Sequence, residues 1–232
     1  MKKIISLLIM IIVSLASFSS SAFAQDDEKT SRSLLFFTGE YTSPEVGDSF
    51  MGWKAFGKHT VYRDADRTDS IGGFGATYKA EPDNDYWKVD LWGFITIPYG
   101  YDVSLGYSEK SSDARYVFAG VDHRYAKVGG TKWALFFDAK NFFALNDKGE
   151  GYLDVYTSAL YPIGKRVKVG ANVVVDHYWT GESREKLFAG GVGQVRLTDD
   201  IAIRARVGRT WDWRDRGDTY SDQIRLDLKF MF

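Results

Sequence analysis

The stretch that decides the fold is TYSDQIRLDLKFMF, residues 219–232. Apolar and aromatic side chains occupy one parity of this stretch, and polar or charged side chains occupy the other. The apolar set is Tyr220, Ile224, Leu226, Leu228, Phe230 and Phe232, and the polar set is Ser221, Gln223, Arg225, Asp227 and Lys229. Because successive side chains of a β-strand point to opposite faces, this alternation predicts a strand with one apolar and one charged face.

Strands of this kind occur in soluble sheets and in membrane barrels. A soluble sheet needs a second layer over its apolar face, and the sequence after residue 24 offers no helical segment for that layer. The stretch that ends at Phe232 resembles the C-terminal strand of bacterial outer-membrane barrels, which their assembly machinery reads. The resemblance implies an outer-membrane location in a Gram-negative bacterium, with the barrel assembly machinery and outer-membrane lipid as partners.

The alternation recurs upstream, for example at 87–91, 167–175 and 201–207. Turn-rich clusters separate such segments, at 64–69, 81–84, 97–100, 109–112, 128–130, 146–149, 162–164, 181–183, 198–200 and 215–218. The clusters delimit eleven strands after residue 48, and the segment 34–41 supplies a twelfth, because single-chain bacterial barrels have even strand numbers. We therefore expect an all-β fold, a closed antiparallel transmembrane β-barrel of twelve strands, with ten as the alternative.

The N-terminus has the pattern of a secretory signal peptide. Lys2 and Lys3 precede an apolar run at 4–16, and Ala22-Phe23-Ala24 precedes an acidic segment. We expect cleavage after Ala24, which leaves one barrel domain at 25–232. The chain contains no cysteine, which excludes disulfides and a lipid-modified N-terminal cysteine, and its net charge of −1 gives no indication of a nucleic-acid partner.

The polar faces of the predicted strands suggest where function lies. Their predicted lumen-lining residues, which we consider for solute selectivity, are Lys168, Asp176, Arg196, Arg204, Arg206, Arg225, Asp227 and Lys229. Basic residues outnumber acidic ones on these faces, and guanidinium groups match carboxylates and phosphates, so the set suits anionic solutes. The same residues can instead brace the barrel, because buried charges must be paired. If they line an open path, we expect that replacing Arg204 and Arg206 leaves Arg225 and Lys229 available as partners for the carboxylates of Asp212 and Asp227; if they brace the barrel, the same change strands those carboxylates.

The basic inward strands and the length of the chain after residue 24 resemble those of the small twelve-stranded porins for acidic oligosaccharides. The resemblance implies a narrow passive channel for small solutes, with a preference for anions and without enzymatic activity. Inward-phase aromatic residues such as Trp92, Phe118 and Tyr152 are expected to narrow the lumen. The sequence contains no motif specific to these porins or to nucleoside channels.

Two other functions remain open from the sequence. One is an accessory barrel in envelope polysaccharide export or assembly, which would act through partners. The other is a lipid A or phospholipid-modifying enzyme at the barrel rim, with His177 and Ser183 as its candidate residues. Asp122 and Asp176 each precede a histidine, but adjacent strand residues point to opposite faces, so neither carboxylate can orient its neighbour. We expect no catalytic residues, no metal site and no cofactor.

Overall fold

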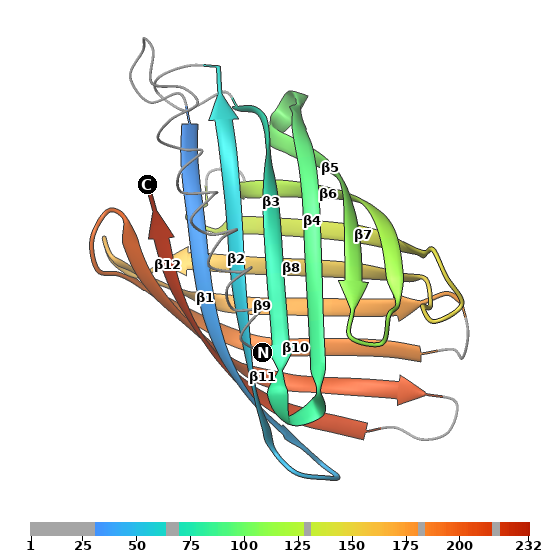
Figure 1. The fold of residues 1–232 in the computed structure, drawn as a ribbon. Helices are drawn as coiled ribbons and strands as arrows, with labels where there is room; N and C mark the ends of the chain where they lie inside the picture. The colour runs from blue at the N-terminus through green and yellow to red at the C-terminus, as the bar shows by residue number, and fades with distance from the viewer. Residues whose placement is uncertain (1–30, 64–69, 128–130, 181–183, 215–218) are drawn as a thin grey trace.

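The protein is a closed barrel of twelve antiparallel strands, in which β1 pairs with β12 and every other strand pairs with its neighbours in sequence (Figure 1). The structure is a computed structural model that describes residues 31–63, 70–127, 131–180, 184–214 and 219–232. The strands are β1 (Ser31–Pro44), β2 (Phe50–Tyr62), β3 (Ser70–Glu81), β4 (Tyr86–Ile97), β5 (Tyr101–Lys110), β6 (Arg115–Lys127), β7 (Ala134–Ala144), β8 (Tyr152–Pro162), β9 (Val167–Tyr178), β10 (Arg184–Arg196), β11 (Ile201–Arg214) and β12 (Thr219–Met231). Two short 3-10 helices, η1 (Pro82–Asn84) and η2 (Pro98–Gly100), lie in connections.

The predicted fold class is therefore confirmed, with twelve strands and not ten. β1 is longer than the predicted segment 34–41, because Arg32 and Thr42 continue its pairing with β2. The predicted signal peptide, residues 1–24, lies outside the described residues.

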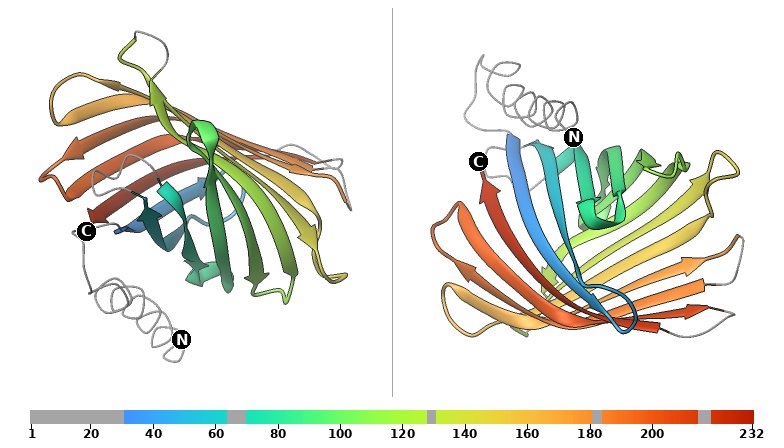
Figure 2. Two further views of the ribbon diagram at one scale, coloured as in Figure 1. Left: turned by 90° about the horizontal axis from the view of Figure 1, so that it is seen from above. Right: turned by 60° about the horizontal axis from the view of Figure 1, so that its bottom comes forward.

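The start of β1 and the end of β12 lie at the same end of the barrel. The backbone amide of Phe232 donates to the carbonyl of Ser33, and Figure 2 shows β1 beginning beside the C-terminus. We call this end, where β1 begins and β12 ends, the terminal mouth, and the other end the opposite mouth. The turns after β4, β8 and β10 also lie at the terminal mouth, and the hairpins after β1, β5 and β7 lie at the opposite mouth.

The strand register assigns every side chain to one of two faces. On β12, Asp227 is 0% exposed whereas its neighbour Leu226 is 56% exposed, so polar residues face the interior and apolar residues face outward. Large exposed outward residues include Val207 on β11, Leu105 on β5 and Ile95 on β4. This distribution is that of a barrel whose outer surface is covered by an apolar medium. In the part of the chain that the structure describes, no helix is long and apolar enough to span a membrane.

Candidate functional site

The lumen of the barrel collects the charged side chains and is the candidate site. All eight of the predicted lumen-lining residues share the inward face, since the register places Lys168 opposite Gln194, Gln194 opposite Arg204 and Arg204 opposite Asp227. They do not form one continuous stripe of free charge. The structure divides them into a braced group on β11 and β12, a group without carboxylate partners near the terminal mouth, and Asp176 near the opposite mouth.

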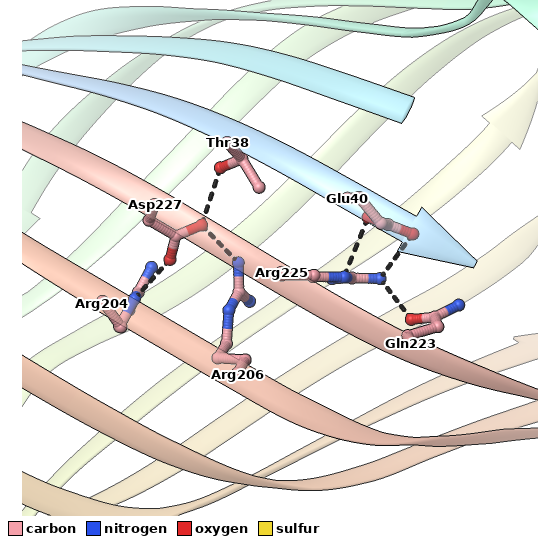
Figure 3. A network of polar contacts seen from close by, with 7 residues as sticks. All are labelled: Thr38, Glu40, Arg204, Arg206, Gln223, Arg225 and Asp227. Atoms are coloured by element: carbon pink, nitrogen blue, oxygen red, sulfur yellow. Dashed lines mark hydrogen bonds and ion pairs between the residues drawn. The ribbon is translucent and has the colours of Figure 1, made fainter. Parts of the chain in front are cut away.

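Asp227 is the centre of the braced group (Figure 3). Its carboxylate accepts hydrogen bonds from Arg204 Nε at 2.6 Å, Arg206 Nη2 at 2.9 Å and Thr38 Oγ1 at 2.8 Å. Thr38 comes from β1, so the network crosses the β1–β12 seam that closes the barrel. Two guanidinium groups and one hydroxyl offset the cost of burying this carboxylate, which is the arrangement that a buried charge requires.

Arg225 belongs to a second pair across the same seam (Figure 3). Its Nε lies 2.9 Å from Glu40 Oε2 of β1, and its Nη2 donates to Gln223 Oε1 at 2.9 Å. The sequence prediction that Arg225 and Lys229 would be available to Asp227 is therefore wrong: Arg225 is held by Glu40, and Lys229 Nζ lies 5.5 Å from the centre of the Phe36 ring. Thr38 and Glu40 complete these two networks and were not among the residues predicted from the sequence, although their parity in β1 matches that of the polar face.

Near the terminal mouth, Lys168, Arg196 and Lys229 form no ion pair with any carboxylate of the described residues. Lys168 lies at the start of β9, Arg196 at the end of β10 and Lys229 near the end of β12. These three are the cations of the predicted set that lack a carboxylate partner among the described residues.

The opposite wall of the terminal mouth carries carboxylates. Asp102 of β5 faces Asp122 of β6, which in turn faces Asp138 of β7. Lys58 of β2 reaches Asp102 Oδ2 at 3.0 Å and Asp122 Oδ2 at 3.5 Å, and Lys140 Nζ lies 2.6 Å from Asp138 Oδ2. These lysines neutralise carboxylates that would otherwise repel one another across the strands.

Asp176, the remaining predicted residue, lies closer to the opposite mouth and faces Asp154 across the β8–β9 ladder. Lys88 pairs with Asp90 at 3.2 Å, and Arg184 pairs with Asp212 at 2.6 Å at the same end of the lumen. Here acids and bases alternate, in contrast to the wall of the terminal mouth that carries Lys168, Arg196 and Lys229.

An aromatic cluster fills one side of the lumen on β6, β7 and β8. It consists of Tyr116, Phe118, Phe142 and Tyr152, all buried, with Trp92 and Tyr178 packed against it. The rings of Phe142 and Tyr152 are stacked, with their centres 4.4 Å apart and an angle of 6° between their planes. The cluster narrows the lumen, as the parity of these residues predicted.

A hairpin of the opposite mouth packs on the cluster. A Cβ at Gly149 would lie 3.0 Å from the Tyr116 ring, so the 145–151 connection lies directly against that ring. Lys148 Nζ lies 3.0 Å from Asp113 Oδ2, and this hydrogen bond lowers the pKa of the exposed Asp113 carboxyl. The two neighbouring hairpins are thus tied together above the aromatic cluster.

The rim histidine is placed outside the lumen. His177 Nδ1 lies 3.0 Å from Glu185 Oε1, and both side chains are about half exposed on the outward face. Ser183, the other residue of the enzyme alternative, lies outside the described residues. Over the ranges that the structure describes, no group of three or more His, Asp or Glu side chains is arranged to hold a metal ion.

Comparisons with known proteins extend this description. No protein-family model matches the chain, and no curated protein matches it. A KdgM porin aligns with a TM-score of 0.55 and 9% identity, over 85% of this chain and 99% of that chain. A KdgM porin in complex with disordered oligogalacturonate aligns with a TM-score of 0.58 and 11% identity, over 86% of this chain and 99% of that chain. The NanC porin aligns with a TM-score of 0.52 and 12% identity, over 84% and 98% of the two chains.

The chain has the fold of these porins. The alignments cover nearly the whole length of each porin, so the likeness concerns the complete barrel. The resemblance predicted from the sequence is confirmed as a likeness of fold. At identities of 9–12%, this likeness does not assign the role of any residue in those proteins to a residue of this chain.

Proposed function

We propose that the protein is a narrow passive channel of the outer membrane for small solutes, with a preference for anions. The observation that carries the proposal is the charge of the lumen. Lys168, Arg196 and Lys229 face the interior, and no described carboxylate is paired with any of them. In a narrow lumen, unneutralised cations raise the local concentration of anions and lower that of cations.

The location rests on several supports. The outer face of the barrel is apolar, β12 has the alternating pattern of an outer-membrane strand, and residues 1–24 have the pattern of a signal peptide. The shared fold with outer-membrane porins agrees with this location. In this setting the terminal mouth faces the periplasm and the barrel assembly machinery acts on the β12 strand.

The anion preference has two supports. Arginine and lysine head groups bind carboxylate and phosphate oxygens with charge-assisted hydrogen bonds. A porin of the same fold has been solved with oligogalacturonate, an anionic saccharide. We do not assign a particular saccharide, or any one anion, to this chain.

The test is a reversal-potential measurement on the purified barrel in a planar lipid bilayer under a salt gradient. We expect single-channel conductance and a reversal potential of the sign that anion permeation produces. The bias should weaken when salt shortens the Debye length from about 10 Å at 0.1 M to about 3 Å at 1 M. A cation-biased reversal potential contradicts the anion preference, and the absence of any conductance contradicts the channel.

One observation favours a second candidate, the accessory barrel in polysaccharide export or assembly. The aromatic cluster of Tyr116, Phe118, Phe142 and Tyr152 occupies lumen space that an open pore leaves to water. A barrel that binds partners can be filled in this way without losing its role. A folded barrel that never conducts would support this candidate.

A further inference from the structure

Five cations gather on the inward face at the terminal mouth. They come from consecutive strands: Lys168 from β9, Arg196 from β10, Arg204 from β11, Lys229 from β12 and Arg32 from β1. The register joins four of them in two rows, because Gln194 links Lys168 to Arg204 and Ala202 links Arg196 to Lys229. The fifth, Arg32, reaches the sulfur of Met231, which follows Lys229 on the same face of β12. They therefore form one patch, which we call the terminal cluster.

The charge of the terminal cluster is not balanced locally. Asp227 pairs with Arg204 and also with Arg206. The strongest electrostatic neighbours of Lys229 are all cations, namely Arg204, Arg32, Lys168 and Arg196. Asp199 and Asp200 lie on the exposed β10–β11 turn, and neither makes an ion pair with the cluster. Arg32 is directed to the sulfur of Met231, at 3.3 Å.

The opposite mouth is different. Arg184 and Lys186 share Asp212, Lys79 pairs with Glu81 at 2.6 Å, and Lys88 pairs with Asp90. Lys110 donates to the Tyr116 hydroxyl at 3.3 Å. Asp154 and Asp176 add two further carboxylates to this region of the lumen. On the far wall of the terminal mouth, Asp102, Asp122 and Asp138 face Lys58 and Lys140, an excess of one carboxylate over the lysines. The cations of the terminal cluster outnumber this excess, so fixed charge along the lumen is positive at the terminal mouth and close to neutral at the opposite mouth.

We propose that the terminal cluster is an anion-binding site and that it makes the channel rectify, with the larger current when anions enter through the terminal mouth. The physical reason is the axial asymmetry of fixed charge. Anions that are driven in through the positive mouth accumulate in the neutral half and raise the conductance, whereas the opposite voltage depletes that half of ions. The inference rests on the proposed channel function and adds the residues that bind anions and the direction in which the current is larger.

The experiment records single channels of the full-length mature barrel in a planar bilayer, with equal potassium chloride on both sides. The substitution Ser49→Cys, in the β1–β2 hairpin, introduces a single cysteine into a chain that has none. A bulky thiol reagent added on one side blocks the current only when this hairpin faces that side, which gives the orientation of each channel. We expect currents at opposite voltages to differ by about twofold or more at 0.01 M salt, where the Debye length is about 30 Å, and to converge at 1 M.

Two variants distinguish the effect of the terminal cluster on the current ratio from the effect of other charges on the surface. The triple variant Lys168→Gln, Arg196→Gln, Lys229→Gln should bring the current ratio to about one, and its folding should be unaffected because these side chains have no carboxylate partners. The matched control, Lys132→Gln with Lys165→Gln, removes lysines that are exposed on turns of the same mouth and should leave the ratio unchanged.

The outcomes divide clearly. A wild-type channel that is anion-biased but has symmetric current–voltage curves overturns the rectifying site and leaves the proposed channel intact. A control variant that abolishes rectification as fully as the triple variant also overturns the site. A barrel that does not conduct overturns both proposals.

Discussion

The guanidinium of Arg206 donates a hydrogen bond of 2.9 Å to Asp227, whose side chain is 1% exposed. Arg204 binds the other oxygen of the same carboxylate at 2.6 Å. Both arginines thus brace the closing seam of the barrel, because Asp227 is linked in turn to Thr38 of β1.

The first prediction follows from this arrangement. The double variant Arg204→Gln, Arg206→Gln should lower the free energy of unfolding by about 3–5 kcal/mol, because it leaves a buried carboxylate without a cation. Adding Asp227→Asn should recover much of the loss. Urea titration of the barrel in lipid vesicles measures both values. Arg196→Gln, at a residue without a carboxylate partner, is the control, and an equal loss there would mean that ion pairing is not the cause.

A second prediction concerns the two faces of β9. Val173 is 37% exposed on the outward face, and Val174 is its inward neighbour. Val173→Arg should cost about 2–4 kcal/mol when its side chain faces the centre of the bilayer, whereas Val174→Arg should cost less because its charge enters a polar lumen. Unfolding in lipid vesicles measures the stability of both variants. The reverse order would show that the outer face of β9 does not meet lipid.

A third prediction concerns glycines that are packed against inward-facing aromatic rings. A Cβ at Gly106 would collide with the Phe118 ring and with the carbonyl oxygen of Leu91. Gly106→Ala should therefore destabilise the barrel by about 1–3 kcal/mol through overpacking. Gly193→Ala is the matched control, since a Cβ at Gly193 meets no atom within 4 Å. Thermal unfolding in mild detergent, followed by the change in gel mobility, compares the two variants. Equal stability would mean that the Phe118 ring and the Leu91 backbone can both move away from the new methyl group.

A fourth prediction concerns export. The mature protein should begin at Gln25, because Ala22-Phe23-Ala24 has the pattern of a cleavage site. Intact mass of the protein from an outer-membrane fraction gives the N-terminus directly. Removing Phe232 should reduce the amount of assembled barrel, while the signal pattern still directs export. Recovery of an uncleaved chain in the inner membrane would contradict the proposed location.

Much of the fold could be predicted from the sequence because alternation is a local property. The parity of Ile224, Leu226 and Leu228 sets the face of β12 without reference to any other strand, and turn-rich clusters mark the strand ends. The partners of the charged residues are not local. Glu40 meets Arg225, and Lys58 meets Asp102, only after the barrel has closed, over separations of 185 and 44 residues. The sequence therefore identified which charges face inward, whereas the division into braced and unpaired cations required the structure.

The last prediction tests whether the aromatic cluster sets the width of the lumen. Phe142 is 1% exposed and stacks on Tyr152, while its neighbour Phe143 is 42% exposed on the outward face. Phe142→Ala removes a ring from the lumen, so it should raise single-channel conductance and admit larger neutral polymers in exclusion measurements. It should also cost about 3–5 kcal/mol of stability, because a buried ring leaves a cavity. Phe143→Ala removes the same ring from the outer surface, so it should leave conductance unchanged. Measuring only channels from material that runs as folded barrel keeps the stability loss out of the conductance values. Equal conductance in Phe142→Ala and wild type would place the narrowest part of the lumen elsewhere, and the charged wall between Lys58 and Asp102 would then be the next segment to test.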